Sequence, residues 1–283
     1  MLLKDIKNKF DKDFCYSRTT RERGSDDSVF FHITQWDNSF LEETQLSYRG
    51  EFNILRKAGR GIQADLAGNP VQNDFVPRDE SREDSAEIAD GLYRAGLTDN
   101  TSIEAFSNAQ MEMVVCGFGA WGLHTEYESL KSGSNNQIVR RFPIYEANNT
   151  VFFDAGAKLL DKSDAGHVTQ LTAYTEDGYK KLTKELTGEE KSMSAFAYPE
   201  KSWVFPWISG TGANTIVHVG SFYHRELIKD KILTYMSPVG QEIQLYESAL
   251  KDVMDDMLNE GFEFISDKEV KRWEVRKYIL YHL

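Results

Sequence analysis

The chain contains little cysteine and no long apolar run. Its 283 residues include only two cysteines, Cys15 and Cys116. Two thiols so far apart do not make a disulfide framework or a thiolate metal site, and a reducing compartment is expected. No apolar run exceeds four residues, far fewer than the roughly 20 that a membrane-spanning helix needs. The N-terminus also lacks the apolar core of a signal peptide, so neither export nor membrane insertion is predicted.

Basic residues are scarce as well. Lys and Arg number 33 against 45 Asp and Glu, which gives a net charge of −12. Tight binding to DNA without sequence preference depends on cations that displace counterions from phosphates. An acidic chain is therefore a poor DNA clamp, but its mild repulsion of a polyanion suits a passage through which DNA slides.

Several catalytic signatures are missing from the sequence. It has no phosphate-binding P-loop and no serine nucleophile elbow, and its six histidines show no metal-binding spacing. One pattern remains, the G-x-G-x-x-G of Gly117, Gly119 and Gly122. In a dinucleotide site a strand precedes this pattern and a helix follows it. Here a predicted helix precedes it and a strand-like segment follows, so the glycines indicate a helix stop and a tight strand entry. No cofactor site, metal site or catalytic residue is predicted.

Composition and periodicity predict an α+β fold. The 40% hydrophobic and 12% aromatic residues are typical of a globular protein. Residues 1–28 are strongly charged and are expected to form a mobile or partner-ordered arm, with the body starting near Val29. Three amphipathic helices are predicted next, over 53–66, 81–96 and 101–116.

The apolar positions of these helices are the expected packing surfaces. Ile54, Ala58, Ile62 and Leu66 recur along one face of the first helix. Ile88, Ala89 and Leu92 are predicted to turn inward from the second. In the third helix, Thr101 and Glu104 have the spacing of a capping box, and Gly117 ends the helix.

The middle of the chain changes to a period of two, which predicts strands. A helix is expected over 176–186, and a longer amphipathic helix over 245–258 that ends at Gly261. The tail from Lys271 alternates like a strand. Strand-like segments are expected over 123–127, 137–145, 151–153, 168–174, 216–223 and 231–236.

The most informative block of the sequence, Gly117 to Pro143, reads GFGAWGLHTEYE, then a polar loop, then NNQIVRRFPI. This block and six others, in their order along the chain, resemble the portal proteins of short-tailed double-stranded DNA phages. The similarity runs from about Phe30 to the last residue. One departure is Gly122, since an Arg follows the Ala-Trp pair in the family. The other blocks are Phe30 to Trp36, Tyr48 to Val71, Asp90 to Arg94, Phe152 to His167, Trp203 to Trp207 and Leu250 to Phe262.

The resemblance implies a structural, non-enzymatic protein and a division of the chain. Residues 29–240 would be the wing domain, with helices packed on a mixed or antiparallel sheet. Residues 241–261 would be a stem helix, and 262–283 the truncated start of the clip region. The complete protein would form a ring of about a dozen subunits at one capsid vertex.

The resemblance also implies partners and a location. The ring would bind the terminase, the tail adaptor and capsid or scaffold proteins, and would hold double-stranded DNA transiently in its channel. It would belong to the virion, and to the host cytoplasm during assembly, while catalysis would belong to the terminase. Two alternatives stay open: a nucleotide- or metal-dependent enzyme that uses the Gly117–Gly122 turn, and an inactive prophage remnant.

Two groups are candidates for a subunit interface. The first is the basic cluster Arg56, Lys57 and Arg60, for which a solvated face and a phosphate contact are the alternatives. The second is the aromatic pair Trp203 and Trp207, which equally suits a core.

The candidate channel-facing residues lie on the polar side of the expected stem helix. A solvated or channel-facing surface explains their charge more simply than metal-assisted cleavage does. They are Lys251, Asp252, Asp255 and Asp256.

The charge balance generates a first prediction. Because the chain carries a net charge of −12, it should bind double-stranded DNA no more tightly than the non-specific range of about 10⁻⁴ to 10⁻⁶ M at physiological salt. A mobility-shift titration measures this directly. Nanomolar binding would contradict the role of a passage that does not hold DNA.

Overall fold

The fold is α+β, as the sequence predicts. The structure is a computed structural model. By contacts the chain divides into two compact units. The first contains residues 1–155, 170–172 and 200–206, and the second contains 156–169, 173–199 and 207–283. The structure describes residues 3–32, 50, 52–69, 73–77, 83–127, 136–192, 205, 207–209, 215–238, 240, 242–250 and 261–280.

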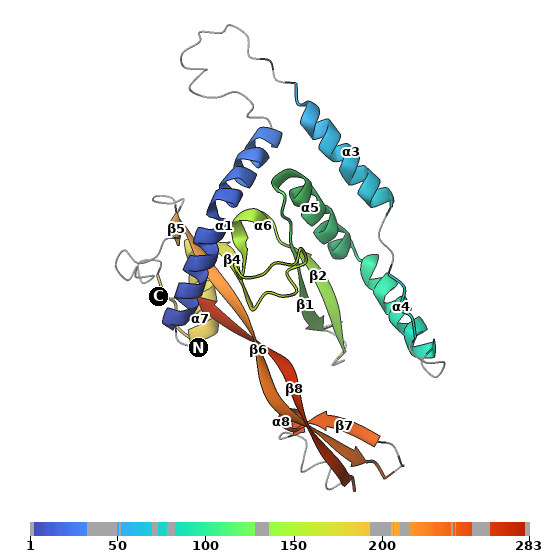
Figure 1. Ribbon diagram of the computed structural model, residues 1–283. Coiled ribbons are helices and arrows are strands. Elements are labelled where there is room, and N and C mark those ends of the chain that lie inside the picture. The colour runs from blue at the N-terminus through green and yellow to red at the C-terminus, as the bar shows by residue number, and fades with distance from the viewer. Residues whose placement is uncertain are drawn as a thin grey trace. The chain divides into compact units, whose positions relative to one another are not determined.

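Helices dominate the first unit (Figure 1). They pack with a two-stranded antiparallel sheet in which Trp121 pairs with Pro143 and Tyr127 with Gln137. The predicted helices and strands of this region are largely confirmed. The elements are α1 (Leu3–His32), α3 (Ile54–Gly68), α4 (Glu83–Leu97), α5 (Asn100–Cys116), β1 (Trp121–Tyr127), β2 (Gln137–Pro143), α6 (Ala147–Thr150) and β3 (Val151–Phe153).

The N-terminal segment differs from the expected mobile arm. It forms the long helix α1, whose Ile6, Phe10 and Phe31 are buried. The ring of Phe10 lies 5.4 Å from that of Phe152, edge to face. Charged residues occur all around α1, and Asp13 is itself buried. They mask the apolar side in the sequence, although a surface helix needs only one apolar stripe to pack.

A buried cation joins α1 to α6 and β3. Arg21 donates hydrogen bonds to the carbonyl oxygens of Asn148 and Val151. Its guanidinium carbon lies 4.1 Å from the ring centroid of Phe152, a cation–π contact. Burial lowers the pKa of Arg21 to about 10, since desolvation disfavours the charged form. Two carbonyls and an aromatic face stabilise this desolvated charge.

The glycine pattern has a packing role. Gly117 ends α5 with φ +75°, as predicted, and β1 follows. A β-carbon at Gly119 would lie 2.0 Å from the carbonyl oxygen of Ala109, and one at Gly122 would lie 2.2 Å from the ring of Phe142. The chain therefore approaches α5 and β2 more closely than any side chain permits.

The predicted capping box of α5 is wrong. The residue that precedes the helix is Asp99, which makes no side-chain capping hydrogen bond. Thr101 lies inside the first turn. Asp99 instead pairs with Arg140 on β2, a contact between distant residues that local spacing does not reveal.

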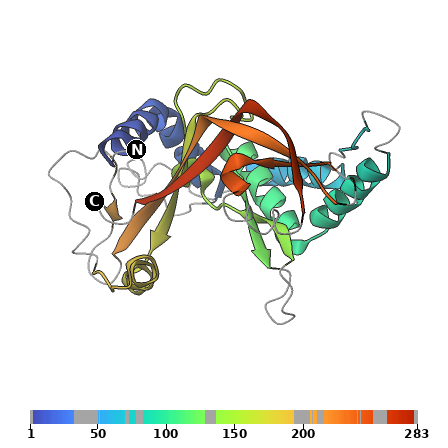
Figure 2. The ribbon, with the colours of Figure 1, turned by 90° about the horizontal axis from the view of Figure 1, so that it is seen from below.

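The second unit is built on a long twisted ribbon. Strand β6 pairs antiparallel with β8, from Gly220 opposite Leu280 to Met236 opposite Glu263, and the two strands cross in both views (Figures 1 and 2). The two predicted strands 216–223 and 231–236 are thus one continuous strand. The elements are β4 (His167–Tyr174), α7 (Glu176–Thr187), β5 (Ile208–Ser209), β6 (Ile216–Met236), β7 (Glu242–Tyr246), α8 (Glu247–Leu250) and β8 (Glu263–Leu280).

The prediction of a stem helix over 241–261 is wrong for its first residues. Residues 242–246 form β7, which pairs antiparallel with β6, and the helix α8 starts at Glu247. Pairing with β6 overrides the helical period, because Ile243 and Leu245 also fit a strand. Tyr235 and Leu250 form a buried cluster with Leu233, Leu245 and Phe262. Residues 251–260 lie outside the described residues.

The tail is a strand, as its alternation predicts, and belongs to β8 up to Leu280. No helix in the described ranges is both long enough and apolar enough to cross a membrane.

The close approach at Gly119 generates a second prediction. Gly119→Ala should lower the free energy of unfolding by about 1–3 kcal/mol or more, because the added methyl group meets the backbone of Ala109. Urea unfolding measures the change. The matched control is Gly61→Ala in α3, where a β-carbon meets nothing within 4 Å. That change should stabilise the helix by up to about 1 kcal/mol, so equal effects of the two variants would contradict this description.

Candidate subunit interface

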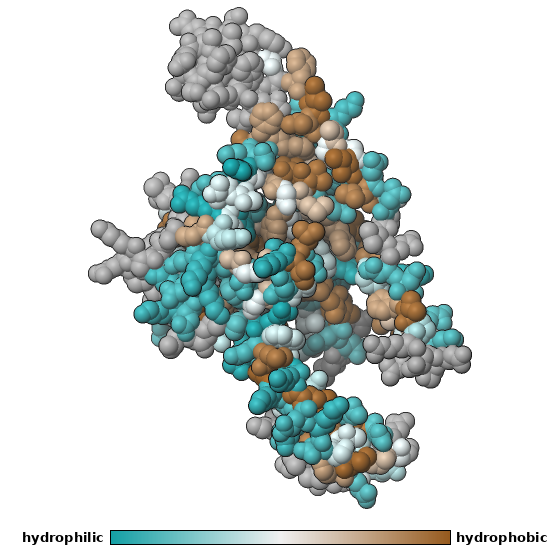
Figure 3. All heavy atoms as spheres, in the orientation of Figure 1, coloured by the Kyte–Doolittle hydropathy of each residue, from teal (hydrophilic) through white to brown (hydrophobic). Residues whose placement is uncertain are grey.

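The apolar face predicted for α3 is exposed. Ile54 is 76% exposed and Ile62 is 49% exposed, and Ala58 between them is exposed as well. Brown spheres follow this helix in the upper right of Figure 3. Leu66, the fourth member of this face, is half-buried. The expectation that such a face packs inward in a single chain is therefore wrong for Ile54, Ala58 and Ile62.

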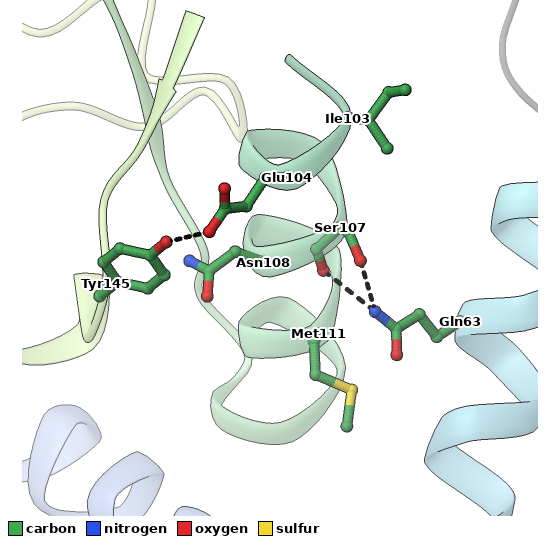
Figure 4. A pocket seen from close by; sticks show the side chains of 7 residues that line it. All are labelled: Gln63, Ile103, Glu104, Ser107, Asn108, Met111 and Tyr145. Carbon is green, nitrogen blue, oxygen red and sulfur yellow. Dashed lines mark hydrogen bonds between the residues drawn. The ribbon is translucent and has the colours of Figure 1, made fainter. Parts of the chain in front are cut away.

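The reason is that α3 docks through a different face. A β-carbon at the buried Gly59 would lie 2.8 Å from the ring of Phe31. Asn53, which caps the helix, donates a 2.6 Å hydrogen bond to the carbonyl oxygen of Phe31. Gln63 donates a 2.8 Å bond to the hydroxyl of Ser107 on α5 (Figure 4). A small residue and two amides therefore orient the helix and leave its apolar face outward.

Helix α4 behaves in the same way. Ile88 is 64% exposed and Leu92 is 70% exposed, although both were predicted to point inward. No described side chain of α4 is buried. The opposite side of the helix meets residues 73–75: Asp90 accepts a hydrogen bond from the Phe75 amide, and the Tyr93 hydroxyl accepts one from Asn73.

Two hollows lie beside α5. The smaller has a volume of about 510 Å³ and lies between α3 and Tyr145, whose hydroxyl donates a hydrogen bond to Glu104 (Figure 4). The larger has a volume of about 950 Å³. Both are lined by Ile103 and Ser107, so they meet at this part of α5.

Arg141 stands inside the larger hollow among aromatic rings. Its guanidinium carbon lies 5.3 Å from the ring centroids of Tyr93 and Phe106 and 5.9 Å from that of Trp121. It donates a 3.0 Å hydrogen bond to the carbonyl oxygen of Gly96 in the last turn of α4, where a cation is favoured by the helix dipole. It thereby joins β2 to α4.

The neighbouring Arg140 points to carboxylates instead. It bonds Asp99 at 2.6 Å and Glu126 at 2.5 Å. The hydrogen bonds from Arg140 lower the pKa of both carboxyl groups, and those carboxylates raise the pKa of Arg140. No such ion pair links Arg141 to a carboxylate among the described residues.

The basic cluster of the candidate interface lies on α3, as predicted. Lys57 and Arg60 are exposed and Arg56 is half-buried. None of the three forms an ion pair with a residue that the structure describes. Their charges are therefore available to a partner molecule.

Of the candidate aromatic pair and the candidate channel-facing group, the structure describes only Trp207. Trp207 is completely buried, and its ring lies 3.4 Å from the position of a β-carbon at Gly220. It therefore forms part of the core and leaves no surface for a neighbouring subunit. Trp203, together with Lys251, Asp252, Asp255 and Asp256, lies outside the described residues.

The exposed faces of α3 and α4 are typical of a subunit of a larger assembly, because soluble monomers rarely leave large apolar faces uncovered. Residues 7–282 match the family model of the phage P22-like portal protein. The chain belongs to this family. It is also 24% identical over 281 residues to a portal protein from Acyrthosiphon pisum secondary endosymbiont phage 1. The matched region is 95% of this chain and 38% of that relative.

The Arg140 network generates a third prediction, on pH. A carboxyl whose pKa is lower in the folded than in the unfolded state contributes stability above its unfolded pKa, and that contribution is lost as the pH falls through the folded pKa. Because the pKa values of Asp99 and Glu126 are both lowered, the effect of Arg140→Met should be larger at pH 7 than below about pH 4.

Arg141→Met is the matched control, since Arg141 has no carboxylate partner among the described residues. Its effect should change little over the same pH range. Thermal unfolding of both variants at a series of pH values measures the difference. An effect of Arg140→Met that does not depend on pH would contradict the network.

Proposed function

We propose that this chain is part of a phage portal, the structural ring through which DNA enters the capsid and leaves it. Membership of the P22-like portal family across residues 7–282 carries the proposal. The chain spans 38% of the length of its phage relative, so the activity of the complete protein is inferred from the family.

The exposed faces of α3 and α4 support a role in assembly. An isolated chain with such faces is incompletely covered, and contacts between subunits would bury them. The net charge of −12 supports a passage that lets DNA slide. In this role the protein is not an enzyme, and the glycines at 117, 119 and 122 serve packing.

The proposed partners follow from the same role. The complete protein would contact copies of itself in a ring of about a dozen subunits. It would bind the terminase, which supplies the catalysis, and the tail adaptor and capsid or scaffold proteins. Its place would be the virion and, during assembly, the host cytoplasm.

Immunogold labelling of virions tests the proposal. Antibodies raised against this chain should label particles of the encoding phage at one vertex, where the tail joins. Tailless particles opened at that vertex should expose the same single site. Label at every vertex would indicate a capsid protein, and unlabelled particles would indicate a protein that is not part of the virion. Either result would contradict the proposal.

A further inference from the structure

We infer that one face of the ribbon formed by β6 and β8 binds the phosphate backbone of double-stranded DNA. The inference rests on the proposed function, because it names the surface through which this chain meets the DNA that a portal admits and releases. Both strands belong to the second unit, and they run side by side (Figure 1). The contact is weak and local, so it agrees with a passage along which DNA slides.

The pairing register divides the side chains of the ribbon between two faces. Successive residues of a strand point to opposite faces, and residues that lie opposite each other in an antiparallel pair share a face. No register shift occurs before Thr234, so the odd-numbered residues of both strands share one face up to that point. We call it the odd face. Four consecutive pairs form its middle: Tyr223 with Lys277, Arg225 with Val275, Leu227 with Trp273 and Lys229 with Lys271.

The middle of the odd face carries cations that have no carboxylate partner. Its four pairs include no Asp or Glu, and the next pair, Lys231 with Glu269, ends this basic surface. Lys229 and Lys271 lie directly opposite each other, where like charges destabilise a sheet. A bound anion would offset this repulsion. No ion pair with a described residue is formed by the four cations, which are Arg225, Lys229, Lys271 and Lys277.

The even-numbered face of the same ribbon neutralises its charges within the chain. Arg272 pairs with Asp230 at 2.6 Å, and Arg276 pairs with Glu274 at 3.1 Å. Each of these cations therefore has a carboxylate beside it. The chain as a whole has a net charge of −12, so a surface with four cations and no carboxylate does not follow from composition. Its charge is complementary to that of a polyanion.

Exposed apolar side chains lie between these cations. The guanidinium carbon of Arg225 lies 4.6 Å from the ring centroid of Trp273, and Nζ of Lys277 lies 5.4 Å from that of Tyr223. Such cation–π contacts orient the two charges on the surface. The apolar groups suit the methyl groups of thymine that line the major groove of DNA. They are Trp273, Val275 and Leu227, which are 56%, 63% and 48% exposed.

The size and composition of the odd face favour DNA over other anions. From Tyr223 to Lys229 the strand rises about 20 Å, at about 3.3 Å per residue. This length corresponds to about six base pairs at roughly 3.4 Å each, and the major groove admits a two-stranded β-ribbon. Three of the four cations are lysines, which contact phosphates readily but are depleted at interfaces between proteins. The surface therefore fits a DNA backbone better than an acidic protein.

A salt titration with a labelled duplex of random sequence tests the contact. Fluorescence anisotropy measures its binding to this chain. Each phosphate contact contributes a slope of about −0.9 to a plot of log K against log salt, so four cations should give roughly −3 to −4. The odd-face variant, Lys229→Gln with Lys271→Gln, should bind about tenfold more weakly or worse at about 50 mM salt, with a slope smaller by about 2. Both side chains are exposed and repel each other, so the melting temperature should not fall.

The matched control is Lys180→Gln with Lys184→Gln on α7. It changes the net charge by the same amount, but these two lysines already pair with Glu176 and Glu190. The control should bind DNA as the unchanged chain does. Equal losses in the control and the odd-face variant would show that DNA responds only to net charge, and this result would overturn the inference. Absence of binding by the unchanged chain at low salt would overturn it as well.

Sedimentation velocity separates DNA from a protein partner. If the odd-face variant keeps its affinity for DNA but loses a self-association that the unchanged chain shows, the odd face binds acidic protein surface and the inference is overturned. Any of these contrary results, together with virion label at one vertex, would remove the DNA contact and leave the portal function standing.

Discussion

The orientation of α3 on its support is the constraint on which the surface of the first unit depends. Gln63 bonds Ser107, and Gly59 touches Phe31 so closely that no side chain fits between them. These contacts leave Ile54 and Ile62 in solvent. An apolar face held outward by specific polar contacts is suited to contact with another molecule.

The sequence predicted where helices and strands lie better than it predicted which face of each helix is buried. Apart from α1, the helices and strands of the first unit follow periodicity and the glycine stop at Gly117, since these signals are local. Which side of α3 or α4 is buried depends on neighbours far along the chain, such as Phe31 for Gly59. In a subunit of an assembly, the same apolar period predicts burial against a partner copy as well as against the core.

The candidate site could be predicted only in part. The cluster of Arg56, Lys57 and Arg60 on α3 could be predicted, because three basic residues within five positions are visible in the sequence. The sequence alone could not decide whether Trp207 lies in the core or at a subunit interface, because large aromatic residues are frequent in both. Residues Glu242 to Tyr246 were predicted as helix but form a strand, since they pair with β6, a distant contact that local sequence does not reveal. Arg140 and Arg141, adjacent in sequence, proved to have different surroundings.

The central claim is that the outward faces of α3 and α4 become buried when subunits assemble. Carbene footprinting with mass spectrometry tests it most directly, because it labels exposed side chains in both the isolated chain and the assembled portal. The account predicts strong labelling of Ile62 and Leu92 in the isolated chain, protection of both in the assembled ring, and unchanged labelling of the exposed Leu160. Equal labelling of Ile62 and Leu92 in the two states would contradict it.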